Sequence, residues 1–271
     1  MSDANATICA QCDRPIDGPD QKFCPSCGQP TPAHRIDWHF LSHELQHSVF
    51  HVDKGILFTI KHLITRPGHM IREYLQGKRG GHFKPVLMIM ILGAIVTLLS
   101  KYLLGTGVFE GMVTINQPDA EEAKAAAGVV DVAGITGAIQ KVSAWMSDHF
   151  GITTLLLVPF EAAALKLAFK RFRNLNYPEW LVITIFLTAQ TFLIYIVGIF
   201  VRQWLPDSTN IVLALAILAN VLTLLQFFQG EKRWKIAVRS AWGIFLFFVM
   251  NTLITAAIGF YIIARYTKGI V

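Results

Sequence analysis

Four cysteines stand in two closely spaced pairs near the start of the chain. Cys9 and Cys12 form one pair, Cys24 and Cys27 form the other, and eleven residues separate the pairs. Two such pairs can direct four thiolates at one tetrahedral ion, and zinc is the usual occupant. Two disulfides or redox-active pairs are the alternative, which a reducing cytoplasm disfavours. The spacing predicts a structural zinc ribbon over residues 1–30, whose folding depends on the metal.

Histidines recur every fourth residue after the cysteines, at His39, His43, His47 and His51, which places them along one face of a helix. His43, Glu44 and His47 also match the HExxH pattern, in which two histidines bind zinc and the glutamate activates water. A short pattern on a polar, histidine-rich helix is easily matched by coincidence. We therefore favour a polar face of a helix on the membrane surface. A catalytic zinc, or a second non-catalytic metal contact, is the alternative.

Two further sets of charged residues could bind ligands. Arg72, Lys78, Arg79 and Lys84 precede the first long apolar run and could contact the phosphates of lipid head groups, including anionic lipid. An orientation signal accounts for the same charges, and we favour that interpretation. Glu161 lies near the middle of an apolar run, where a carboxylate is costly and often functional. It is the candidate for a transport or proton-relay role.

Long apolar runs must position these groups. The 271-residue chain is 53% hydrophobic and 15% charged, whereas soluble domains carry about 25% charged residues. A helix needs about 20 apolar residues to cross a bilayer. The sequence therefore predicts about five transmembrane helices, over 86–104, 152–169, 181–201, 211–228 and 241–263. The stretch 125–139 contains Asp131 and three glycines, and we expect a surface segment there.

Basic residues concentrate in three of the connectors: ahead of the first run, at 170–173 and at 232–239. The positive-inside rule then places the amino terminus in the cytoplasm and the carboxyl terminus outside. This distribution accounts for the net charge of +6 without a nucleic-acid partner. No apolar segment follows residues 1–7, so we expect no cleaved secretory signal.

The predicted fold is mainly α: a polytopic helical membrane protein with a small amino-terminal zinc ribbon. Residues 31–84 are expected to form a linker and cytoplasmic amphipathic or interfacial helices, and 85–271 the membrane domain. Pro30 and Pro32 indicate a mobile tether behind the ribbon. Two helical pieces, 55–63 and 70–75, are expected to be broken at 65–68.

Several of these residues form a recognisable pattern: CPSCGQ at 24–29, an Arg–Ile pair, Asp53-Lys54-Gly55 with Thr59, and RPGxxIREYLxGKR at 66–79. The pattern resembles a family of uncharacterised bacterial inner-membrane proteins, catalogued as a domain of unknown function. The resemblance covers roughly residues 24–92. It implies an inner-membrane location and a cysteine ribbon joined to several spans, but no established activity.

We favour a function without catalysis: a scaffold or adaptor whose zinc ribbon recruits a cytoplasmic protein partner to the bilayer. One alternative is a transporter or lipid-handling protein that uses Glu161 and the basic cluster. The other is a membrane zinc hydrolase at 43–47. Whether the chain is an enzyme is left open, as are its substrate and oligomeric state.

Overall fold

The computed structural model describes residues 8–16, 21–31, 33, 35–47, 55–105, 107, 132–170, 175–205 and 208–267. Within helices, the side chains of 43–47, 132–136, 138–140, 255–256 and 258–267 are outside this description. The described chain is mainly helical, and its β pairing consists of two isolated bridges near the amino terminus. The prediction of a mainly helical, polytopic membrane protein is confirmed at this level.

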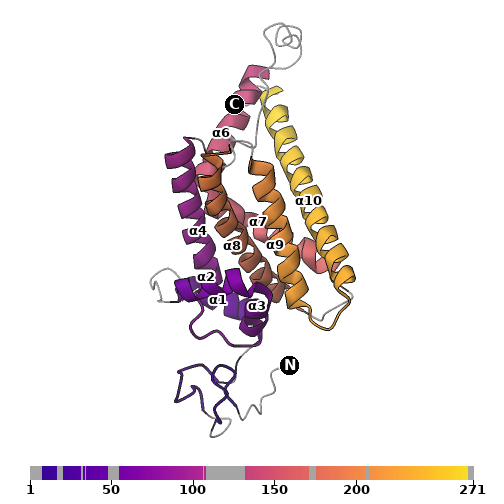
Figure 1. Ribbon diagram of the computed structural model, residues 1–271. Helices are drawn as coiled ribbons and strands as arrows, with labels where there is room; N and C mark the ends of the chain where they lie inside the picture. Colours follow the sequence, from indigo (N-terminus) through magenta and orange to yellow (C-terminus); the bar gives the residue numbers. More distant parts are fainter. Residues whose placement is uncertain are drawn as a thin grey trace.

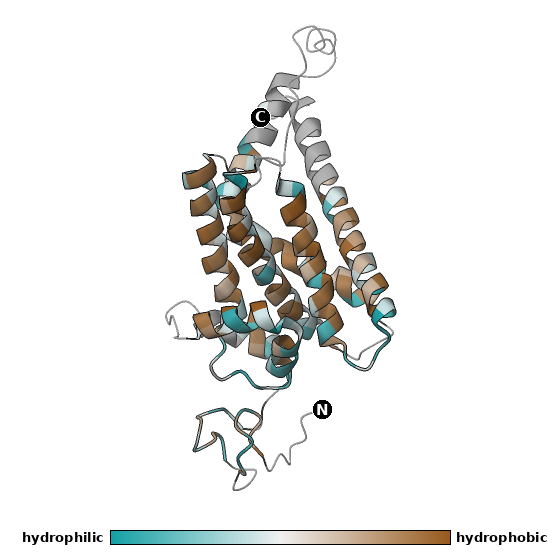
Figure 2. Ribbon diagram, viewed as in Figure 1, coloured by the Kyte–Doolittle hydropathy of each residue, from teal (hydrophilic) through white to brown (hydrophobic). Residues whose placement is uncertain are grey.

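Five helices in the described part have the length and apolar composition needed to cross a membrane. The predicted ranges fall on these helices, which stand side by side (Figure 1). Figure 2 shows apolar residues along most of α4, α8 and α9. The five are α4 (Pro85–Leu99) with the π-helical turn η1 (Ser100–Leu104), α7 (Phe150–Ala168), α8 (Tyr177–Arg202), α9 (Thr209–Phe227) and α10 (Arg233–Thr267).

Helix α8 forms the centre of the bundle, in contact with α4, α7 and α9. Two thirds (67%) of its most apolar stretch is buried, against 17% for α10, whose outward residues are left for lipid. Polar side chains also join the helices: the Thr223 hydroxyl donates to Gln190 Oε1 at 2.8 Å, and Asn220 Nδ2 donates to Thr191 Oγ1 at 3.2 Å. Such bonds satisfy polar groups that lipid cannot.

Three short helices lie at one end of the bundle (Figure 1): α1 (Trp38–His47), α2 (Ile56–Thr65) and α3 (Pro67–Leu75). Helix α2 ends and α3 begins on either side of Arg66, where Pro67 occupies the first turn of α3 and suits a helix start. Helix α3 packs on α9. Helix α6 (Val132–Asp148) lies toward the opposite end of the bundle.

Candidate metal centre and its seat on the bundle

The four cysteines lie together in the amino-terminal part, which we call the cysteine head (residues 8–16 and 21–31). The Sγ atoms of Cys9 and Cys27 are 3.6 Å apart, as are those of Cys12 and Cys24, and all four lie within 4.8 Å of one another. Tetrahedral metal–sulfur bonds of about 2.3 Å separate the ligands by roughly 3.8 Å, whereas a disulfide needs about 2.05 Å. The arrangement fits one metal ion and four free thiols.

The two halves of the cysteine head repeat each other. Residues 8–15 (ICAQCDRP) and 23–30 (FCPSCGQP) have the same cysteine spacing, and an isolated antiparallel bridge joins the ends of each half. The residue after the second cysteine has a left-handed backbone in both halves, with φ of 57° at Asp13 and 71° at Gly28. Each half is therefore the same tight turn, and the two turns place their thiols face to face.

Backbone amides support the thiolate form of one of the four cysteines, Cys24. The amides of Ser26 and Cys27 hydrogen-bond the sulfur of Cys24 and lower the pKa of this thiol to about 6. A lowered pKa makes the thiolate available at neutral pH. The turn that positions Cys24 therefore also prepares it as a ligand.

The cysteine head is seated on the loop between α3 and α4. Gln11 forms two hydrogen bonds with Gly80: its Nε2 donates to the carbonyl O at 3.0 Å, and its Oε1 accepts from the amide N at 3.0 Å. Gln29 Nε2 donates to the carbonyl O of Gly77 at 3.1 Å. Each half of the head thus contributes one glutamine. Side-chain bonds to a distant loop therefore position the head, whereas the tether expected around Pro30 and Pro32 lies partly outside the described residues and stays a prediction.

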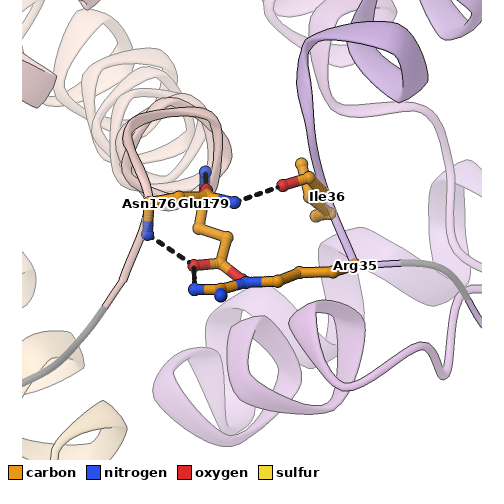
Figure 3. Close-up of polar contacts among 4 residues, drawn as sticks. All are labelled: Arg35, Ile36, Asn176 and Glu179. Atoms are coloured by element: carbon orange, nitrogen blue, oxygen red, sulfur yellow. Dashed lines mark hydrogen bonds and ion pairs between the residues drawn. The ribbon is translucent and has the colours of Figure 1, made fainter. Parts of the chain in front are cut away.

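The segment behind the head is joined to the start of α8 (Figure 3). Arg35 contacts the Glu179 carboxylate twice, Nε to Oε1 at 2.6 Å and Nη2 to Oε2 at 2.8 Å. Asn176 Nδ2 donates to the Ile36 carbonyl O at 2.7 Å. The Arg35 side chain is 49% exposed and that of Glu179 only 6% exposed. A paired arginine satisfies a carboxylate that would be costly to bury alone.

Glu179 also caps the amino terminus of α8. Its amide donates to Asn176 Oδ1 at 2.8 Å, and its Oε2 accepts from the Asn176 amide at 2.7 Å. These reciprocal bonds form a capping box that satisfies donors at the start of α8. The Glu179 carboxylate therefore caps the amino terminus of α8 and also binds Arg35 of the amino-terminal segment.

The structure separates the four basic residues predicted for lipid head groups. Arg72 donates to the backbone carbonyls of Gln226 and Phe227, at the carboxyl end of α9. The Arg79 guanidinium lies 4.2 Å from the ring centroid of Phe40.

Lys78 faces the cysteine head, with its Nζ 3.9 Å from Asp13 Oδ2. Lys84 stands at the N-cap of α4. These four residues therefore make separate contacts rather than forming one cluster of converging donors.

The histidine-rich segment is described only in part. His43, Glu44 and His47 lie on α1, but their side chains are outside the described part, as is the whole of His51. His39 is exposed. Among the described residues, the four cysteines are the group of metal-binding side chains close enough to share an ion.

Glu161 lies on α7 and faces the central helix. The Thr188 hydroxyl of α8 lies 3.5 Å from its Oε2, a long contact between two candidate spans, and is 2.9 Å from the Thr184 carbonyl O, to which it also donates. The Lys166 Nζ lies 5.7 Å from the ring centroid of Tyr177 instead of pairing with Glu161.

Two features of the site were missed by sequence reasoning. The 15-residue repeat of the head can be read directly by aligning the two cysteine pairs. The Asn176–x–x–Glu179 spacing is the sequence pattern of a capping box and marks the start of α8. The pairing of Glu179 with Arg35 has no such local pattern, because 144 residues separate the partners.

Residues 53–97 match the family model described as "Protein of unknown function (DUF3667)". No curated protein and no solved structure matches the chain significantly. The match spans α2, α3, the following loop and most of α4, and it leaves the cysteine head outside. The chain therefore contains a segment similar to a domain of unknown function, and that segment includes the loop on which the cysteine head is seated.

Proposed function

We propose that the chain is a membrane scaffold whose cysteine head binds one zinc ion and presents a fixed surface to a protein partner. The observation that carries this proposal is the seating of the head by Gln11 and Gln29, one from each half. A head held in this way can place a bound partner at a defined position beside the membrane.

Zinc is the ion that four thiolates in this geometry favour, and Cys9, Cys12, Cys24 and Cys27 would hold it. Four protein ligands complete a tetrahedral shell and leave no position for a substrate or water. The zinc would therefore shape the head rather than perform catalysis. This supports a binding function over an enzymatic one.

The head carries an exposed apolar side chain at the same position of each half. Ile8 is 55% exposed and Phe23 is 60% exposed. Exposed aromatic and aliphatic side chains are common anchors at protein interfaces. Under the positive-inside rule, the basic connectors favour a cytoplasmic position for this surface at an inner membrane, and the proposed partner is then a cytoplasmic protein.

Metal analysis of the purified full chain tests the zinc. We expect one zinc per chain, lost in Cys24→Ser because three thiolates no longer close the shell. Ser26→Ala, in the same turn, should keep the metal. A purified wild-type protein without zinc would overturn this part of the proposal.

Photo-cross-linking in cells tests the recruiting surface. A photoreactive residue at Phe23 should form a discrete protein adduct, and Cys24→Ser in the same chain should abolish it. The control position is Trp204, which is 84% exposed at the other end of the bundle. The same adduct from both positions, or none from Phe23, would contradict a partner-binding head.

Transport or lipid handling is the second candidate, and the contact between Glu161 and Thr188 favours it. A carboxylate between two spans is costly, and residues of this kind commonly mark functional sites. In this alternative, lipid phosphates would also contact the basic residues Arg72, Lys78, Arg79 and Lys84. Glu161→Gln separates the two functions. A scaffold with this change keeps the photo-cross-linked adduct at Phe23 and the wild-type growth phenotype. A transporter with this change loses transport activity while remaining folded.

A further inference from the structure

A small, half-open pocket of about 20 Å³ lies at the end of the bundle opposite α1, α2 and α3. Its walls come from η1 and from the facing ends of α8 and α9. Its position at the ends of three candidate spans corresponds to the head-group level of a bilayer.

The polar residues that line the pocket suit a negatively charged ligand. Arg202, the last residue of α8, lines it, as do Ser208 and Thr209 at the start of α9. The amino terminus of a 19-residue helix such as α9 offers unpaired amides and a partial positive charge. In the described part of the chain, Arg202 has no ion pair that would already neutralise it.

The buried hydroxyl of Ser208 is a second, independent observation that points to a ligand in the pocket. It is the N-cap of α9, yet its side chain makes no capping hydrogen bond. The residue is 2% exposed, and its Oγ is buried with no hydrogen-bond partner among the described residues. A buried hydroxyl without a partner loses free energy unless something in the pocket bonds to it.

Apolar side chains complete the lining of the pocket, and Leu104, Ile199 and Val212 are among them. Leu104 ends the π-helical turn η1, a rare local geometry that often accompanies functional sites. A ligand with an anionic group next to an apolar part therefore suits this mixed lining. Among common biological anions, phosphate best uses one guanidinium, a hydroxyl and helix amides together.

We propose that this pocket binds a phosphate group, with the Arg202 guanidinium, the Ser208 hydroxyl and the amides at the start of α9 as donors. The phosphate belongs either to a lipid head group or to a small soluble phosphate. This site is independent of the cysteine head and lies at the other end of the bundle.

The test uses the full chain purified in dodecyl maltoside. Native mass spectrometry measures retention of dioleoyl phosphatidylglycerol and of dioleoylglycerol, which lacks the phosphate. Equilibrium dialysis measures binding of inorganic phosphate. We expect one saturable phosphatidylglycerol site and no matching dioleoylglycerol site. Inorganic phosphate that competes with the lipid would identify a soluble source, and lipid binding without phosphate binding would identify the lipid.

Arg202→Gln should weaken binding about tenfold or more, since a charge-assisted bond is lost. Ser208→Ala should weaken it severalfold and keep the fold, because its hydroxyl has no partner among the described residues. Arg233→Gln, the same change at the other end of the bundle, should bind as wild type, and so should Cys24→Ser. Wild-type affinity in both Arg202→Gln and Ser208→Ala, or equal retention of dioleoylglycerol, would overturn the site.

Discussion

Arg72 illustrates how a basic residue next to a membrane span can serve the fold. Its guanidinium donates to the carbonyls of Gln226 and Phe227, two of the carbonyls that the end of α9 leaves without helical partners. A positive charge is also favourable at a helix carboxyl terminus. The planar, multiply donating guanidinium suits this task in a way that a lysine ammonium does not.

Arg72→Gln should therefore lower the free energy of unfolding by about 1–3 kcal/mol, because buried carbonyls lose charged donors. Lys78→Gln is the matched control, since its Nζ lies 3.9 Å from an exposed Asp13 and surface pairs contribute about 0–1 kcal/mol. Thermal unfolding in detergent measures both. Unchanged unfolding in Arg72→Gln, with lipid binding lost, would instead assign Arg72 to head-group recognition.

At the scale of elements, the contact between α3 and α9 is unusually close. A Cβ added to Gly68 would lie 2.4 Å from the Thr223 carbonyl O and 2.5 Å from the Phe227 amide N. These are backbone atoms, so no side chain can rotate away. Glycine lets the two helices approach until Arg72, one turn further along α3, reaches the end of α9.

Gly68→Ala should destabilise the protein by about 1–3 kcal/mol or more, as expected for overpacking against backbone. Gly137→Ala in α6 is the control, because a Cβ there meets nothing within 4 Å and alanine favours a helix by up to about 1 kcal/mol. Denaturation followed by circular dichroism distinguishes the two. Equal stability of Gly68→Ala and wild type would mean that α3 and α9 are less closely packed than described.

The elements were largely predictable because bilayer crossing imposes length and composition on each span. The break between α2 and α3 was also readable, since Pro67 suits a helix start. Helix α10 extends further than the predicted 241–263, because its first turns from Arg233 carry charge that hydropathy alone rejects. Contacts between residues far apart in the chain, such as Gln11 with the Gly80 backbone, left no pattern in the sequence.

At the scale of the whole molecule, the amino-terminal part is attached to the bundle at two places. The cysteine head is seated on the loop between α3 and α4, and Arg35 is joined to Glu179 at the start of α8. Neither attachment includes a cysteine. Positioning of the head and binding of metal by the head can therefore be altered separately.

The double variant Gln11→Ala, Gln29→Ala should release the head while keeping its metal, because three hydrogen bonds to the loop are lost. We expect limited proteolysis near residue 33 to accelerate at least about fivefold, since each bond contributes about 1 kcal/mol. Gln203→Ala, the same change at the other end of the bundle, should be cut at the wild-type rate. An unchanged cleavage rate in the double variant would show that other contacts seat the head.

The distance in sequence between Arg35 and Glu179 also sets an order of events during synthesis. The 144 residues between them need on the order of ten seconds of translation. The loop that seats the head emerges much earlier, after fewer than 50 residues beyond Arg35. The head can therefore bind the loop between α3 and α4 before most of the spans have been synthesised. The ion pair between Arg35 and Glu179 forms only after the start of α8 has been synthesised. In a nascent chain stalled before Glu179, the head should already contact the loop between α3 and α4, while Arg35 still lacks the Glu179 carboxylate.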